Sequence, residues 1–376
     1  MIRFFKKINR YVPLFAWIFT AVGVVATAVY VAALLSSDFA NFWSDNISSV
    51  LRAFMAHLTS FLPFSLAETL LVSSPIILVC LIVYVIRAGI RSNQALVRCV
   101  VGMLSILIFV WSVFVFNFGV SYRTDTLDKR LGMNREKVSG EELYETISIV
   151  IENLNELVDD VVMVQDEGSI RPYSHEEAVR LCTESYEKLS DSYDFIQKLK
   201  APVKQIMLSE YMTYTHISGV YTFFTGEANL NTNYPYFVNV YTTAHEMAHQ
   251  RGVAREDEAN FIAYLVCIGS DDVFMQYSGY LNMYEYLISA LYKASPTLYA
   301  KAVRELDLSV RYDLNCYSEF FDKYRENVAA DVSDAVNNKY LEVQGSQAGS
   351  KSYGMVVDLA VAYYRPLFAA SEVGAE

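Results

Sequence analysis

Three long runs without a charged residue lie in the first third of the chain. Residues 11–37, 69–86 and 99–122 contain no Asp, Glu, Lys or Arg. A helix needs about 20 apolar residues to cross the hydrocarbon core of a bilayer. The pattern predicts transmembrane helices at about 12–35, 69–87 and 99–121. A cleaved signal peptide or three buried helices of a soluble core would be alternatives, but the first run is too long for a signal peptide, and two more follow it closely.

The charges beside these runs predict their orientation. Four basic residues precede the first run, and Arg87, Arg91 and Arg98 lie between the second and third. The segment between the first two runs carries Arg52 and three acidic residues. Because basic loops stay in the cytoplasm, we expect a cytoplasmic N-terminus and an extracytoplasmic C-terminal part. Residues 47–68 read as an amphipathic or re-entrant helix, broken at Pro63, that can lie along the outer interface.

Charge and tyrosine divide the chain at the same place. Residues 1–121 hold 8 Lys and Arg against 3 Asp and Glu, whereas the remaining 22 basic and 39 acidic residues follow, with 25 of the 28 tyrosines. We therefore predict a membrane domain at 1–122 and a folded outer domain at 123–376. The net charge of −12 argues against nucleic acid as a partner. A lipid bilayer is the expected partner, and the oligomeric state stays open.

The outer domain is expected to be mostly α, with a small β-sheet that makes it α+β. Apolar spacing predicts helices at 141–162 and, after a Ser174 cap, at 175–198. Residues 217–240 are rich in Tyr, Phe, Thr and Val between Gly and Asn, which predicts two or three short strands. Helical spacing resumes from Tyr241 to about Tyr324, and a last helix, too polar to be a fourth span, follows residue 354.

The stretch at residues 241–265 carries the chemistry. His245 and His249 are four residues apart on a predicted helix, so both imidazoles lie on one face and can bind one metal ion. Glu246 is placed to reach a water molecule beside that ion. Two imidazoles and a carboxylate suit Zn²⁺ and leave a coordination position open. Gly252 is expected to end this helix.

A second helix, starting near Arg255, offers the third ligand. Glu256 and Glu258 both lie in its first turn, but Glu256 shares a face with two alanines that permit close packing against the histidine helix. We prefer Glu256. Asn260, one turn further on, is a candidate to hold a ligand histidine from outside the coordination shell.

These residues resemble two known families. HEMAH followed by EDEAN (residues 245–249 and 256–260) resembles the gluzincin metallopeptidases, which implies a zincin-like domain with His245, His249 and Glu256 as zinc ligands and Glu246 as the catalytic general base. The six residues between His249 and Glu256 are short for that group. The segments LPFSLAE, FTGEANLN, HEMAHQRGVAREDEANFIAYL and SYG also resemble an uncharacterised bacterial membrane family, domain of unknown function 3810.

The gluzincin resemblance implies that an edge strand just before the zinc helix binds an extended peptide. Residues 219–224 or 227–230 are the candidates, with an ordinary hairpin as the alternative. The candidates for substrate binding are Gly226, Glu227, Asn229 and Asn231, and the candidates for transition-state donors are Tyr280, Tyr284 and Tyr353. A structural role is expected for His216. The outer domain also has three cysteines, which form a disulfide or stay free: Cys182, Cys267 and Cys316.

The leading hypothesis is a membrane-anchored zinc metallopeptidase that hydrolyses peptide bonds of a peptide or protein substrate outside the cytoplasm. The alternative is a non-catalytic zinc-binding membrane sensor or assembly protein. An intact HExxH favours the enzyme, since a structural zinc site has no need of Glu246.

Overall fold

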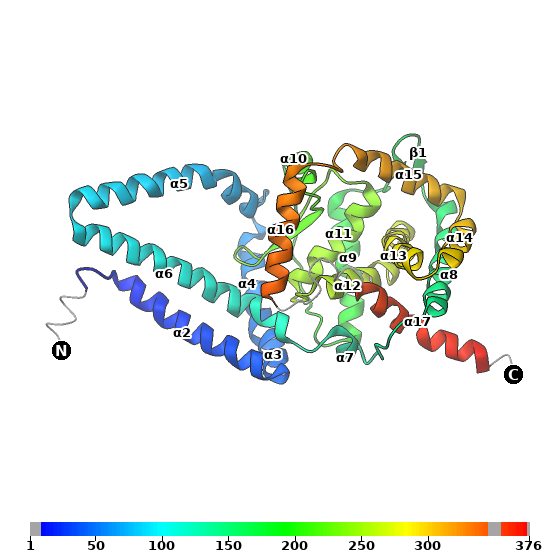
Figure 1. Ribbon diagram of the computed structural model, residues 1–376, viewed down its shortest axis with the longest axis horizontal. Helices are drawn as coiled ribbons and strands as arrows, with labels where there is room; N and C mark the ends of the chain where they lie inside the picture. The colour runs from blue at the N-terminus through cyan, green and yellow to red at the C-terminus, as the bar shows by residue number, and fades with distance from the viewer. Residues whose placement is uncertain (1–8, 345–354, 374–376) are drawn as a thin grey trace. The chain divides into compact units, whose positions relative to one another are not determined.

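The computed structural model describes residues 9–344 and 355–373 as a mostly helical chain in two compact units (Figure 1). One unit comprises residues up to Thr124 together with Thr222–Glu227, and the other holds Asp125–Tyr221 and the chain from Ala228 onward. We call them the apolar-helix unit and the metal-site unit. The inclusion of residues 222–227 in the apolar-helix unit was not anticipated from the sequence.

The apolar-helix unit contains three helices that are long and apolar enough to cross a membrane. They are α2 (Leu14–Leu35), α5 (Leu66–Arg91) and α6 (Asn93–Asn117). Helices α2 and α6 lie side by side (Figure 1), with Phe19 stacked on Phe109 at 4.4 Å between ring centroids. Helix α5 buries none of its residues within the unit, as a lipid-facing helix would.

Shorter helices join α2 to α5. They are α3 (Ser37–Phe42), a π-helical turn (Trp43–Ser48) and α4 (Ser49–Ser60), and a 3-10 turn (Gly119–Arg123) follows α6. The predicted helix before Pro63 is therefore present and ends at Ser60. Arg52 of α4 is buried, and it donates to the Asn117 carbonyl at the end of α6 at 3.1 Å.

Helices α5 and α6 do not start and end where the uncharged runs do. Helix α5 begins at Leu66, and α6 runs from Asn93 to Asn117 rather than from 99 to 121. The turn between them is the single extended residue Ser92, whose side chain accepts a hydrogen bond from the Ala95 amide. Charged residues end an uncharged run without ending a helix, because arginine is a good helix former.

The metal-site unit is built from eleven helices of at least five residues and five short strands among the residues described. The first part comprises α7 (Leu127–Leu131), α8 (Gly140–Leu157) with a 3-10 turn (Val158–Asp160), β1 (Met163–Val164), β2 (Gly168–Ser169), α9 (His175–Ser192), β3 (Val203–Gln205) and α10 (Ser209–Thr213). The second part comprises β4 (Gly219–Thr222), β5 (Glu227–Leu230), α11 (Tyr236–Gln250), α12 (Glu256–Ile268), α13 (Val273–Ala294), α14 (Pro296–Glu305), α15 (Leu308–Asp322), α16 (Val328–Val343) and α17 (Met355–Val373).

The core of this unit forms around α13, which packs against α8, α11 and α12. The predicted apolar stripe of α8 is confirmed, because its five members are all buried: Leu143, Ile147, Val150, Ile151 and Leu154. Helix α17 packs on α12 and α8 and is not among the three candidate spans found in the described residues, in line with the expectation for the last helix.

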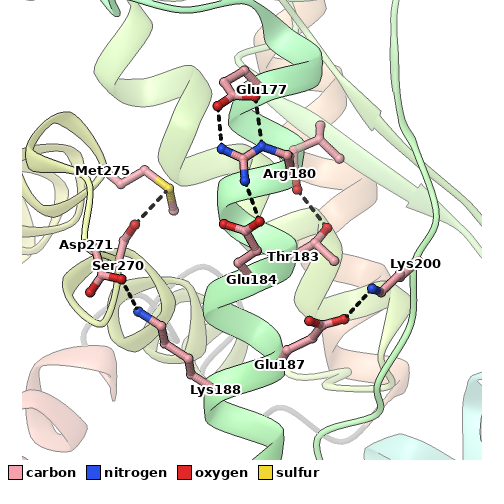
Figure 2. Close-up of polar contacts among 11 residues, drawn as sticks. Glu177, Arg180, Thr183, Glu184, Glu187, Lys188, Lys200, Ser270, Asp271 and Met275 are labelled. Atoms are coloured by element: carbon pink, nitrogen blue, oxygen red, sulfur yellow. Dashed lines mark hydrogen bonds and ion pairs between the residues drawn. The ribbon is translucent and has the colours of Figure 1, made fainter.

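Helix α9 begins where its cap predicts and ends earlier than expected. The Glu177 amide donates to the Ser174 hydroxyl at 3.3 Å, but the helix stops at Ser192 rather than 198. Figure 2 shows its exposed face, where Arg180 pairs with Glu177 and Glu184 one turn away on either side, and Lys188 reaches Asp271 at 2.8 Å. Its opposite face packs on α11 and α12.

The small sheet has the strand order β3-β5-β4, with β3 parallel to β5. Strand β5 is the central and fully buried strand, so β4 is the edge strand on the side of the hairpin. Two of the predicted strands are present, but residues 236–240 are wrong as a strand because they form the first turns of α11. Four of those five residues are buried, and burial on most sides suits a core helix as well as a strand.

Candidate metal centre

Helices α11 and α12 carry the candidate site and are joined by a tight turn. Gly252 follows the end of α11 with φ at 97°, a conformation that only glycine adopts without strain. The Gly252 amide donates to the His249 carbonyl at 2.9 Å, and the Val253 amide donates to Ala248 at 3.1 Å. This closing turn is the expected helix end, and it lets α12 start at Glu256 and return beside α11.

Two alanines of α12, Ala259 and Ala263, are fully buried. Their small side chains let α11 and α12 pack closely, as the sequence predicts. Because Glu256 shares their face of α12, the packing brings its carboxylate to the histidines of α11.

The side chains of His245, His249 and Glu256 converge, with one potential ligand atom from each within 4.8 Å of the others. The Glu256 oxygens lie 3.3 Å from Nε2 of His245 and 3.5 Å from Nε2 of His249. These separations exceed the usual 2.7–3.2 Å of an N–H···O hydrogen bond. The two distances involve different Glu256 oxygens, Oε2 for His245 and Oε1 for His249. Two imidazoles and a carboxylate that converge in this way are the ligand types of a Zn²⁺ site.

A backbone carbonyl orients the ring of His249, one of the candidate ligands. Nδ1 of His249 lies 2.7 Å from the Val253 carbonyl, which leaves Nε2 to face Glu256. Carbonyl partners of this kind commonly fix the ring of a metal-binding histidine. The prediction that Asn260 does this is not supported, because its carbonyl accepts from Tyr241 and its buried Nδ2 has no hydrogen-bond partner among the described residues.

The side chains of the cluster shift one another's pKa. Burial lowers the pKa of His249, but the Glu256 carboxylate more than offsets this and raises it to about 9. Burial also raises the pKa of Glu256, yet the two histidines hold it well below its usual range. An ionised carboxylate beside two imidazoles is a donor set suited to a cation.

Glu246 lies on the same helix outside this set of ligands. Its side chain is buried, and burial raises the pKa of its carboxyl to about 7 despite the opposing effect of both histidines. Its Oε2 has no hydrogen-bond partner among the described residues. A carboxyl with a pKa near neutrality can both accept and release a proton.

Gly219, at the start of β4, lies directly against Glu246. A Cβ on this glycine would be 2.6 Å from Oε1 of Glu246 and 2.7 Å from Cγ2 of Thr242, so only glycine fits. The Thr242 hydroxyl also donates to the Ser218 hydroxyl at 3.2 Å. From the sequence, Gly219 is predicted only to be a strand residue, since no local pattern indicates that it approaches Glu246.

The rival third ligand has a different role. Oε1 of Glu258 accepts from the Leu127 amide at 2.9 Å and from Arg255 at 2.8 Å. Glu258 is buried by these contacts and is not part of the three-residue cluster. The structure thus brings together Glu256, the preferred candidate, with both histidines.

The predicted substrate-binding residues do not line an open cleft. The side chains of Glu227, Asn229 and Asn231 are at most 2% exposed. Gly226 and Glu227 lie in the part of the hairpin that belongs to the apolar-helix unit, and Asn229 donates to the Val220 carbonyl at 3.0 Å. Alternating polar residues usually indicate the exposed face of a strand, but they do not do so here because β5 is buried on both faces.

The remaining candidates have partners elsewhere. Tyr280 packs against Tyr264, and Tyr284 interacts with Tyr299 and Arg311, so neither contacts the cluster within the described residues. Tyr353 lies outside the described residues. Nε2 of His216 lies 2.6 Å from the Tyr324 carbonyl, which fits a structural role.

Of the two alternatives for the cysteines, the Cys182–Cys316 disulfide is not formed. Cys182, Cys267 and Cys316 are free and buried, which matches the alternative of buried thiols. None of the three belongs to the cluster described above, as far as the described residues show.

The comparisons place the chain in a family. The family described as a protein of unknown function, DUF3810, matches residues 43–361. The chain belongs to this family. No curated protein and no solved structure matches it. The match covers residues from the π-helical turn to α17 and includes both helices of the metal centre.

Proposed function

We propose that this member of the DUF3810 family is a membrane-anchored zinc metallopeptidase that acts outside the cytoplasm. The observation that carries the proposal is the convergence of His245, His249 and Glu256, with one potential ligand atom from each within 4.8 Å of the others, beside a buried carboxyl that is not part of this cluster. A structural zinc site needs the first feature only.

The chain's own residues divide the work as follows. His245, His249 and Glu256 would hold Zn²⁺, which supplies Lewis-acid polarisation of a carbonyl and of a water molecule. Glu246 accepts the proton of the attacking water and returns it to the leaving amine. A carboxyl with a pKa near 7 suits both transfers at neutral pH.

Strand β4 is the surface that best fits an extended peptide. It lies at one edge of its sheet. Val220 within the strand and Ile217 just before it are each 37% exposed. Edge strands offer unpaired backbone groups to a peptide that adds as a further strand. The other candidate, β5, is paired on both sides and is therefore excluded as that surface.

The extracytoplasmic location rests on the basic residues of the short loops. Arg87 and Arg91 lie in the last two turns of α5, and Arg98 lies in the second turn of α6. These arginines lie near Ser92, which joins α5 to α6. The positive-inside rule assigns this end of the two helices to the cytoplasm. The metal-site unit follows the other end of α6.

Metal content is the first test. The full chain, purified in detergent, should hold about one zinc ion, measured by mass spectrometry of the metals. His245→Ala and Glu256→Gln should lose it, and Glu258→Gln is the matched control on the same helical turn. Retention by Glu256→Gln with loss in Glu258→Gln would refute the ligand assignment.

Catalysis needs a separate test. Glu246→Gln keeps the size of the side chain but removes the base, so zinc should stay while peptide cleavage falls by about 10²–10⁴-fold. The assay compares the termini of surface and secreted proteins between cells that carry the wild type and cells that carry the variant. Full rescue of a null phenotype by Glu246→Gln would favour the zinc-binding sensor instead.

A further inference from the structure

The hairpin of β4 and β5 is the segment where the chain passes from one unit to the other and back. Its strands leave and re-enter the metal-site unit after Tyr221 and at Ala228, and its tip, Thr222–Glu227, belongs to the apolar-helix unit. The tip is a tight turn, in which the Gly226 amide donates to the Thr222 carbonyl at 2.8 Å.

Glu227 caps a membrane helix. Its two carboxylate oxygens accept from the backbone amides of Leu66 and Ala67 at 3.1 and 3.0 Å. These are the first two residues of α5, whose amides have no partner within the helix. The side chain is 2% exposed, so this charge is buried against the positive end of the helix dipole.

The rest of the tip is held by the neighbouring helices of the same unit. Thr59 of α4 donates to the Thr225 carbonyl at 3.2 Å, and Asn117 at the end of α6 donates to the Phe223 carbonyl. A Cβ on Gly226 would lie 2.6 Å from the Ala56 amide nitrogen. The tip is therefore docked closely against α4, α5 and α6.

The other end of β4 is the glycine that contacts Glu246. Gly219 and Thr222 are only three positions apart, about 10 Å of extended chain at roughly 3.3 Å per residue. A short strand clamped at Thr222–Glu227 leaves little freedom at Gly219. The metal ligands, by contrast, come from α11 and α12, which pack on each other without the hairpin.

We propose that Glu227 is a positioning residue, which fixes the hairpin to the N-terminus of α5 and thereby holds β4 in place beside Glu246. The inference rests on the proposed function for the role of β4 and Glu246, but the anchoring itself does not depend on it.

The test uses the full chain in lipid nanodiscs and three variants. Glu227→Ala removes the cap, and Gly226→Ala pushes the tip from α4 without touching the carboxylate. Glu210→Gln is the control, since its side chain is 59% exposed. Amide hydrogen exchange of residues 219–222, zinc content, and kcat and KM for a quenched fluorescent peptide mixture are measured for each.

Glu227→Ala and Gly226→Ala should speed exchange at residues 219–222 about tenfold or more, while exchange in α11 and α12 and zinc content stay unchanged. KM should rise for both, and Glu227→Gln, which keeps one acceptor, should restore part of the loss. Unchanged exchange at 219–222 in both variants would overturn the anchoring. Loss of zinc with general loss of protection would also overturn it, because Glu227 would then only support the fold.

The two proposals fail separately. A wild-type chain without zinc or cleavage refutes the peptidase, whereas the exchange experiment still reports whether Glu227 anchors β4.

Discussion

Replacing Gly219 with alanine should separate metal binding from catalysis. The new Cβ would lie 2.6 Å from Oε1 and 2.7 Å from Cγ of Glu246, and 2.7 Å from Cγ2 of Thr242. Non-bonded carbon atoms prefer about 3.5–4.0 Å. Either β4 or the Glu246 side chain must therefore move by about 1 Å.

The size of the effect follows from that displacement. A misplacement of about 1 Å at a reacting group can cost about 10²-fold in rate. None of the three closest atoms belongs to a metal ligand, so zinc content should stay at the wild-type value. Overpacking should also lower the free energy of unfolding by about 1–3 kcal/mol.

Gly140→Ala is the matched control. Gly140 is the first residue of α8, and a Cβ there meets no atom within 4 Å. Zinc content and cleavage of the fluorescent peptide mixture are compared for both variants and wild type. Full cleavage by Gly219→Ala, with normal zinc, would mean that Glu246 is not the base or that β4 does not adjoin it.

Three further predictions test other parts of the molecule. Burial raises the pKa of Glu285 from 4.5 to about 7, so the folded state keeps a proton that the unfolded chain releases, and stability falls as pH rises between those values. Glu285→Gln should remove this fall, so at pH 8 its free energy of unfolding should exceed that of the wild type by about 1–3 kcal/mol. Denaturant unfolding, followed by the near-ultraviolet circular dichroism of tyrosine, measures the difference. Ala263→Leu, at a fully buried position of α12, should cost about 1–3 kcal/mol and weaken zinc affinity, measured by chelator competition; unchanged affinity would contradict the close packing of α11 on α12. A reporter that is active only outside the cytoplasm, fused after Glu376, should be active, and activity of a cytoplasm-only reporter there would refute the three-span topology.

Features set by nearby residues could be predicted from the sequence. The Gly252 turn, the Ser174 cap and the buried stripe of α8 depend on neighbours within a turn or two of helix. The choice of Glu256 over Glu258 is of the same kind, because residues two apart on a helix point in different directions. The three candidate ligands lie within 12 residues of sequence, so helix geometry and one turn suffice to bring them together.

Features set by distant residues could not be predicted. Residues 236–240 have the composition of a strand, but their burial among other helices makes them helical. The sequence offers Glu227 as a candidate for substrate binding. In the structure it binds the amides of Leu66 and Ala67, which lie about 160 positions earlier in the chain. No pattern around Glu227 indicates that a helix N-terminus will cover it.

The same division should separate the proposed metal binding from the proposed catalysis. The candidate ligands depend on a short helix–turn–helix, so substitutions outside α11, α12 and the turn between them should leave zinc content unchanged. The surroundings of Glu246 depend on Gly219, which arrives on a strand whose far end is fixed to α5 by Glu227. Zinc content and cleavage should therefore respond to different sets of substitutions. Variants of the hairpin that keep zinc and lose cleavage would identify the substrate surface, because a purely structural zinc site has no reason to depend on β4.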